Sequence, residues 1–195
     1  VMIANVDEDD GGREFQRFMA VRLFKRRSGL GYRGRVHETL MGENGLPPVL
    51  YEEKHRLLIR HTGYSTKRIV QKARRNLALL QTDIEAHGEG PQHYRFLADC
   101  FASLGRPEEA LHYAQLAVTA PLQAVGSQSD MYFLILQCLR WLERPLEERL
   151  TAARAAQEAF PLLPEYQAEE GALLEEKGRV FEARERLTRA LELYR

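Results

Sequence analysis

The stretch QHYRFLADCFASLGRPEEA, residues 92–110, decides the fold of this chain. It places an aromatic residue, a Leu-Ala pair and a second aromatic residue before a Leu-Gly turn and a Glu-Ala pair. Ala98 and Ala110 are small enough to let two helix backbones approach closely, and Gly105 between them suits the left-handed cap that ends a helix. We therefore expect two antiparallel helices joined by a short turn.

The same pattern recurs towards the C-terminus. Ala156 and Ala190 are 34 residues apart, whereas Ala117 precedes Ala156 by 39 residues, so the first junction carries about five extra residues. The segment 119–128 contains proline and glycine and can hold this insertion as a loop. The chain therefore carries three copies of one helical hairpin.

The three copies differ in how well they keep the pattern. The last copy has Gly171 in its first helix, Gly178 at the turn and Ala183 in its second helix. The middle copy is degenerate and places the larger residues Gln137, Arg144 and Arg149 at those three positions.

The pattern resembles tetratricopeptide repeats, which implies a mainly α fold in which helix pairs stack into a superhelix. The resemblance covers residues 91–195, with repeats at about 91–124, 130–163 and 164–195; the alternative is a generic helical bundle. Such repeats bind a protein or peptide in a groove lined by the first helix of each pair. The resemblance implies that this groove is lined by Arg95, Asp99, Leu134, Cys138 and Trp141. The last three form an apolar row, and the alternative is that a capping helix or core packing covers that row.

A long helix is expected immediately before the repeats, within a linking segment at 64–90. Apolar residues follow the helical spacing over 65–86, where they occupy Ile69, Val70, Ala73, Leu77, Leu80 and Ile84. The Gly-Glu-Gly-Pro run after His87 ends this helix. We expect it to cap the first repeat.

Residues 1–63 have a different texture, typical of short strands in part of an α/β domain. The candidate strands are Val1–Val6, Phe18–Phe24 and Leu57–His61. The acidic run Asp7–Asp10 has only six residues before it, too few for the strands that precede a nucleotide-binding motif, and is expected to be an exposed turn. Segment 1–63 is too thin for a complete core.

Two motifs in this part, RLFK at 22–25 and GRVHE at 34–38, resemble the C-terminal end of bacterial family 2 glycosyltransferases. The later His-x-Gly-Tyr at 61–64 resembles the subgroup that continues into tetratricopeptide repeats. The resemblance covers roughly 17–120. It implies the tail of an enzyme that transfers sugar from a nucleotide sugar to a glycan, lipid or protein, without its nucleotide-binding half and so inactive alone.

The resemblance also implies roles for individual residues in the full enzyme. Glu38 is the candidate catalytic carboxylate, His37 the candidate ligand of a divalent Mn or Mg ion, and Arg22, Arg33 and Arg35 the candidate contacts to phosphate oxygens. The alternative is that His37 and Glu38 only close a loop. No cofactor is expected in this segment alone.

The composition limits the classes of partner that the chain is expected to bind. The chain of 195 residues has a net charge of zero, and no recognised nucleic-acid module occurs, so nucleic acid is not expected as a partner. The charge is uneven: residues 1–87 carry 16 basic and 11 acidic residues, and the rest carry 12 and 17. The sequence contains no run of eighteen apolar residues, so no membrane span is predicted. Two isolated cysteines fit a cytoplasmic protein, with peripheral association with the inner membrane as the alternative.

Three functions are compatible with these observations: the tail of a glycosyltransferase, a pure protein-interaction module, and a homodimer formed through the open C-terminal end. The residues expected at that end are Leu187, Leu191, Leu193 and Tyr194.

Overall fold

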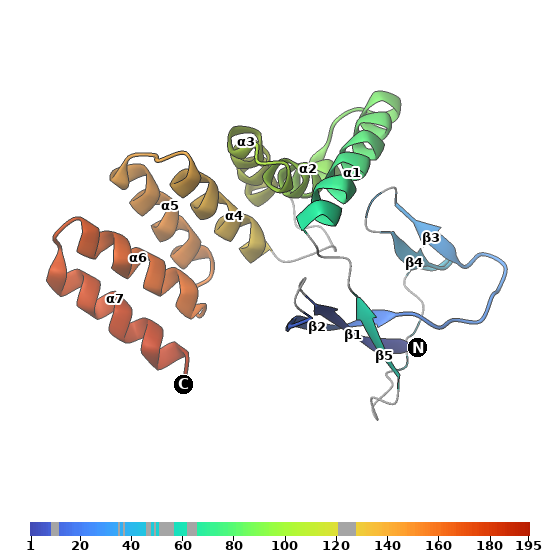
Figure 1. Cartoon of the computed structure of the whole chain (residues 1–195), viewed down its shortest axis with the longest axis horizontal. Coiled ribbons are helices and arrows are strands. Elements are labelled where there is room, and N and C mark those ends of the chain that lie inside the picture. The colour runs from blue at the N-terminus through green and yellow to red at the C-terminus, as the bar shows by residue number, and fades with distance from the viewer. Residues whose placement is uncertain are drawn as a thin grey trace. The chain divides into compact units, whose positions relative to one another are not determined.

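The computed structural model describes residues 1–8, 12–34, 36, 38–45, 48, 50, 57–61, 66–120 and 128–195. The chain divides into two compact units, residues 1–88 and 89–195. Strands lie in the first unit and paired helices make up the second (Figure 1).

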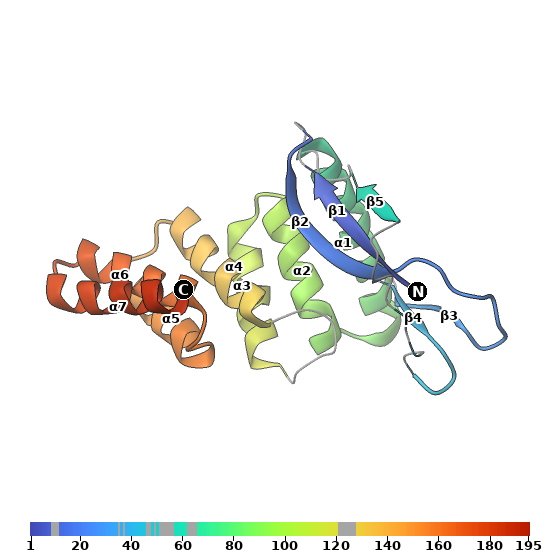
Figure 2. The ribbon, with the colours of Figure 1, turned by 90° about the horizontal axis from the view of Figure 1, so that it is seen from below.

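The strands of the first unit form a three-stranded sheet in the order β2-β1-β5 (Figure 2). Strand β1 (Met2–Glu8) pairs antiparallel with β2 (Glu14–Val21) and parallel with β5 (Leu58–His61). Two further strands, β3 (Gly31–Arg33) and β4 (Thr39–Met41), form a separate antiparallel pair. The sequence did not predict this pair, because β3 lies between glycines that are typical of turns.

Strand β1 is longer and more deeply buried than expected. Residues 3–7 are at most 3% exposed, including the polar Asn5 and Asp7. The prediction that Asp7 belongs to an exposed turn is therefore wrong, while residues 9–11 lie outside the described residues. The reason is tertiary, since β1 has a partner strand on each edge and its residues 3–7, which alternate between the two faces of the sheet, are all buried.

Helix α1 spans Thr66–His87, close to the range predicted for the linking helix. Ala73 and Leu80 of its apolar stripe are buried, at 5% and 3% exposed. The helix ends before Gly88, whose φ of 83° is the left-handed conformation that glycine adopts most easily. None of the described helices is long and apolar enough to cross a membrane.

The second unit consists of three antiparallel helix pairs (Figures 1 and 2). The bounds of its helices are α2 (Pro91–Ser103), α3 (Pro107–Thr119), α4 (Gln128–Trp141), α5 (Leu146–Ala159), α6 (Pro164–Glu176) and α7 (Val180–Leu193). Each helix packs on the next in the chain. The arrangement confirms the mainly α fold and its repeating hairpins.

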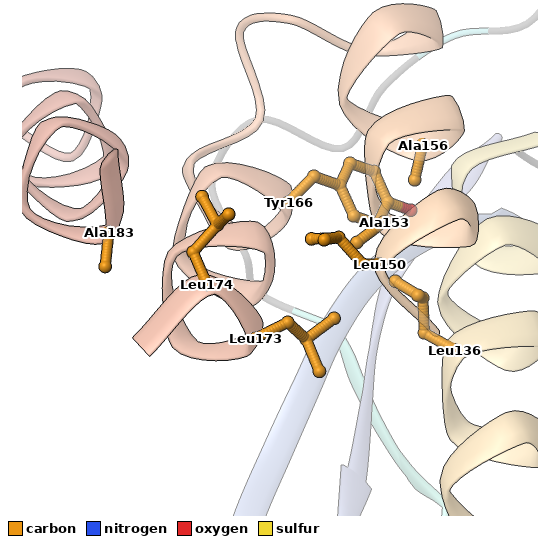
Figure 3. Packing of buried hydrophobic residues seen from close by; sticks show 8 residues of the cluster. All are labelled: Leu136, Leu150, Ala153, Ala156, Tyr166, Leu173, Leu174 and Ala183. Atoms are coloured by element: carbon orange, nitrogen blue, oxygen red, sulfur yellow. The ribbon is translucent and has the colours of Figure 1, made fainter. Parts of the chain in front are cut away.

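The core of the last two pairs shows why small residues recur (Figure 3). Ala153 and Ala156 of α5 are fully buried and leave room for the larger Tyr166 and Leu174 of α6. The cluster consists of Leu136, Leu150, Ala153, Ala156, Tyr166, Leu173, Leu174 and Ala183. Each hairpin thus completes its core only against a neighbouring hairpin.

The middle pair has a different register from the one predicted. The turns of the outer pairs use Gly105 and Gly178, with φ of 69° and 80°, and the middle turn uses Glu143, with φ of 50°. The expected residue at this place was Arg144, so the register of α4 shifts by one residue. Leu136, which is buried, then occupies the position predicted for Gln137.

Replacing Glu143 by glycine is expected to raise the free energy of unfolding by about 1 kcal/mol, because a side chain in the left-handed region clashes with its own backbone. Chemical denaturation followed by circular dichroism measures this. Gly105→Ala and Gly178→Ala are the matched controls and should lower the free energy of unfolding by a similar amount. An added Cβ meets no atom within 4 Å at either site, so the backbone strain alone causes the loss. A destabilised Glu143→Gly variant would contradict the assignment.

Candidate functional site

The first helices of the three pairs, α2, α4 and α6, present one polar face, which we call the A-helix face. We define it by Arg95, Asp99, Asp130, Phe133, Arg140 and Glu169. Two ion pairs connect its helices. Nη2 of Arg95 on α2 lies 2.8 Å from Oδ2 of Asp130 on α4, and Nη2 of Arg140 on α4 lies 2.6 Å from Oε1 of Glu169 on α6.

Arg95 also faces a second carboxylate, since its Nε lies 4.0 Å from Oδ2 of Asp99. Partial burial raises the pKa of Asp99 to about 6; Arg95 opposes this rise and the nearby Asp130 adds to it. Arg95 and Asp99 are the two groove residues predicted on α2. Arg95 is thus ion-paired with Asp130 and also lies near Asp99, whose carboxyl group becomes charged close to neutral pH.

Replacing Asp99 by asparagine is expected to change how stability depends on pH. Since the folded pKa lies above the ordinary value of 3.8, the folded chain binds the proton more tightly, and stability falls as pH rises from about 4 to 6. The variant should lack this fall and be more stable at pH 7. The side chain of Asp99 is 45% exposed, so solvent screening keeps the gain in the free energy of unfolding below about 1 kcal/mol. Denaturation curves across this pH range test it, and unchanged curves would contradict it.

An aromatic side chain stands exposed on this face. Phe133 is 52% exposed and lies on the same side of α4 as Asp130 and Arg140, three residues after one and seven before the other. Trp141, at the end of α4, is 54% exposed. The face therefore offers apolar surface beside paired charges.

Two residues predicted to line the groove do not reach the surface. Leu134 is 7% exposed and Cys138 is fully buried, so both belong to the core. The one-residue shift of α4 is the reason, because it turns this apolar row inward and turns Asp130, Phe133 and Arg140 outward. The exposed Phe133 was missed for the same reason; the left-handed turn at Glu143 gives no signal in the sequence.

The thiols of the two cysteines, Cys100 and Cys138, are not reactive at neutral pH. Both are free and buried. Burial raises the pKa of Cys100 to about 11, with a further contribution from Asp99, and burial alone raises the pKa of Cys138 to about 11. Both thiols therefore stay protonated at neutral pH and act as small apolar side chains.

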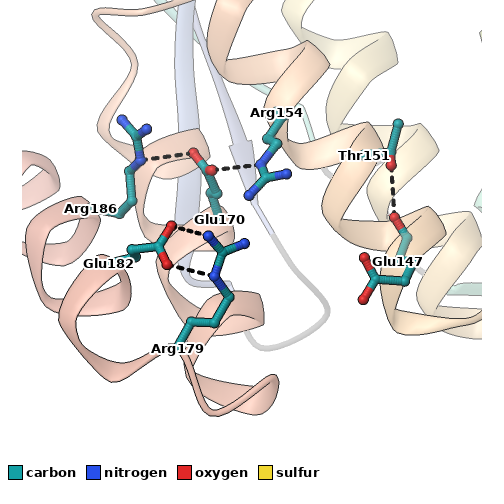
Figure 4. A network of polar contacts seen from close by, with 7 residues as sticks. All are labelled: Glu147, Thr151, Arg154, Glu170, Arg179, Glu182 and Arg186. Atoms are coloured by element: carbon teal, nitrogen blue, oxygen red, sulfur yellow. Dashed lines mark hydrogen bonds and ion pairs between the residues drawn. The ribbon is translucent and has the colours of Figure 1, made fainter.

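A buried charge lies in the last pair (Figure 4). Glu170 of α6 is 2% exposed, and its Oε1 accepts a hydrogen bond of 3.0 Å from Nε of Arg154 on α5. Nε of Arg186 on α7 lies 3.1 Å from the other carboxylate oxygen, as an ion pair without hydrogen-bond geometry. This network joins three helices and is structural in character.

The residues given roles by the glycosyltransferase resemblance lie in the first unit. Arg22 is exposed, and its Nε donates a hydrogen bond of 2.8 Å to Oδ1 of the buried Asn5. Arg33 of β3 and Glu38 are exposed, while Arg35 and His37 lie outside the described residues. Within the described ranges, no three His, Cys, Asp or Glu residues are grouped as a metal site. The roles of all five residues stay predictions.

The open side of α7 is the region expected to form a homodimer. Leu191 and Tyr194 are 66% and 80% exposed, and Leu187 and Leu193 are half-buried. Self-association through this end stays a prediction.

Comparison with known proteins identifies the fold of the helical part of the chain. No family model matches the chain, and no curated protein matches it. Among solved structures, MamA matches with a TM-score of 0.51 and 14% identity over 66% of this chain and 78% of that one. YrrB, described as a TPR protein with an unusual peptide-binding site, matches with a TM-score of 0.50 and 22% identity over 66% of this chain and 64% of that one. The helical part of this chain therefore has the fold of tetratricopeptide repeats.

Proposed function

We propose that the helical repeats are a protein-interaction scaffold that binds an extended polypeptide segment on the A-helix face. The observation that carries this proposal is Phe133, which stands 52% exposed beside the Arg95–Asp130 and Arg140–Glu169 ion pairs. An exposed aromatic ring gains free energy when a partner covers it, and it costs little side-chain entropy to fix. The peptide-binding site named for YrrB supports the same kind of ligand.

The charges around Phe133 define what a ligand should look like. Arg140 and Glu169 are already paired across α4 and α6, with side chains 59% and 24% exposed, so the guanidinium keeps free surface towards solvent. Asp99 and Asp130 place acidic groups at the other end. A segment with an apolar anchor, an acidic residue towards Arg140 and a basic residue towards Asp99 would complement this face.

Replacing Phe133 by serine is expected to weaken binding by about tenfold or more, as loss of an aromatic anchor does at other interfaces. The probes are peptides enriched from a random display library on the immobilised chain, and titration calorimetry measures their affinity. Phe181→Ser is the matched control, because Phe181 of α7 is 91% exposed and lies off the A-helix face. Equal losses in both variants, or no enriched peptide, would overturn the proposal.

A second candidate function concerns the first unit, which we propose is the end of a nucleotide-sugar transferase domain. Its support is the edge strand β5 and the residue before it: Leu57, just before the strand, and Leu58 and Ile59 within it are 49%, 41% and 37% exposed. A sheet edge this apolar fits a sheet that continues into a larger α/β domain. A divalent metal and the roles of Glu38, His37 and the three arginines belong to this proposal.

The test is thermal stability of the chain in the presence of uridine diphosphate sugars and manganese, compared with a longer chain that includes upstream sequence. Stabilisation of the longer chain, lost on Arg33→Gln, would support the transferase reading. No response from either chain would leave the repeat scaffold as the function.

A further inference from the structure

The segment between β2 and β3 joins unusual charge to exposed apolar groups. Residues 22–33, which run from the end of β2 through β3 and which we call the basic loop, contain five cations and no acidic residue. Its cations Arg22, Lys25, Arg26, Arg27 and Arg33 are all exposed. Figure 2 shows the chain between β2 and β3 as a long loop. A loop of this kind keeps a strong positive potential close to the surface.

Apolar side chains stand beside these cations. Leu23 and Phe24 are 51% and 43% exposed, and Tyr32 is 56% exposed. The rings of Phe24 and Tyr32 meet edge to face, with centroids 5.7 Å apart, so they form one small aromatic ledge. Leu50, which is 74% exposed, belongs to the same surface.

A recess of about 610 Å³ lies against the basic loop. Its apolar wall includes Leu23, Phe24, Leu40 and Leu50, and Lys25 and Arg27 also line it. Among the described residues that line the recess, Glu43 is the one with a carboxylate; it lies against Gly29, with Oε1 2.5 Å from the place of an added Cβ. Although the rings of Phe24 and Tyr32 touch, Leu23, Phe24, Tyr32 and Leu50 all keep large exposed fractions, so a partner surface could still bury them.

We propose that the basic loop docks this protein on an anionic lipid bilayer. Cations of the loop approach lipid phosphates, and each is worth about a fivefold gain in affinity near an anionic surface. Leu23, Phe24 and Tyr32 enter the interfacial layer, where aromatic and aliphatic groups leave water. Nucleic acid is the less suited occupant: Phe24 and Tyr32 offer rings to bases, but the exposed aliphatic side chains of Leu23 and Leu50 beside them do not. The inference is independent of the A-helix face, which lies in the other unit. It shares Arg22 and Arg33 with the transferase proposal, so the variant that tests its charge changes only Lys25, Arg26 and Arg27.

Binding to vesicles tests the electrostatic half of the proposal. The chain is floated with phosphatidylcholine vesicles and with vesicles that also contain phosphatidylglycerol, at low and high salt. Binding is expected only with phosphatidylglycerol and should weaken as salt rises. The variant Lys25→Gln/Arg26→Gln/Arg27→Gln should lose about a hundredfold in affinity. The charge-matched control Arg184→Gln/Arg189→Gln/Arg195→Gln, which changes exposed cations of the helical unit, should bind as the wild type does.

A fluorescent reporter tests insertion. Trp141 is the only tryptophan of the chain, so Phe24→Trp in a Trp141→Phe background carries one reporter in the loop. Its emission should shift to shorter wavelength with phosphatidylglycerol vesicles and stay unchanged with phosphatidylcholine alone. Equal binding of the two triple variants, binding without a shift, or displacement of the chain from vesicles by single-stranded RNA would overturn the proposal.

Discussion

Replacing Arg154 and Arg186 together by methionine should lower the free energy of unfolding of the repeats by about 3–5 kcal/mol. The two guanidinium groups are the cations paired with Glu170, which is 2% exposed. Without them the carboxylate stays inside the protein with no compensating charge. Urea denaturation followed by helical circular dichroism measures the loss.

The reverse change should cost much less. Glu170→Met leaves two arginines whose side chains are 44% and 38% exposed, and these can turn to water. Methionine also fills the buried volume, so we expect a change within about 1 kcal/mol of wild type. This asymmetry is the informative result: equal losses in the two variants would show that packing, and not the buried charge, determines the cost.

The substitution Gly171→Ala should destabilise the last helix pair by about 1–3 kcal/mol, because it overfills the contact between α6 and α7. A Cβ at Gly171 would lie 2.8 Å from Cγ of Leu187 and 3.3 Å from the carbonyl oxygen of Ala183. The side chain of Leu187 can move away only in part, and the backbone oxygen of Ala183 cannot move. Thermal unfolding of the variant tests this.

A double-mutant cycle isolates that contact. Leu187→Ala removes the atoms nearest to the added Cβ, so Gly171→Ala should cost less in the Leu187→Ala background than in the wild type. Gly90 is the control position: the three atoms nearest to an added Cβ all belong to the side chain of Gln92, an exposed residue that can move. Additive effects at 171 and 187 would rule out the close contact as the cause.

Much of the helical part could be predicted from local signals. The small residues Ala98, Ala110, Gly171 and Ala183 mark where helices meet, and glycine marks two of the three turns. Such signals depend on the geometry of one hairpin, which a short stretch of sequence contains. The linking helix was predicted within one residue at each end, since its stripe and its glycine stop are both local.

The candidate site was predicted less well, and the reason is a single residue. Glu143 adopts a left-handed conformation that its own preferences oppose, so the sequence placed the middle turn one residue too late. A shift of one residue turns a helix by about 100°, which moves Leu134 and Cys138 from the expected surface into the core. Phe133 entered the site by the same rotation.

By itself, the sequence determined the repeating helical hairpins, their small contact residues and the change of texture near residue 64, because each of these depends on neighbours in the chain. Only the tertiary structure decided which side of α4 faces solvent, that Asp7 lies inside a central strand, and that Glu170 is held by arginines from two other helices. These features depend on residues far apart in sequence. Their free energy comes from burial and charge pairing, which exist only after the elements have packed together.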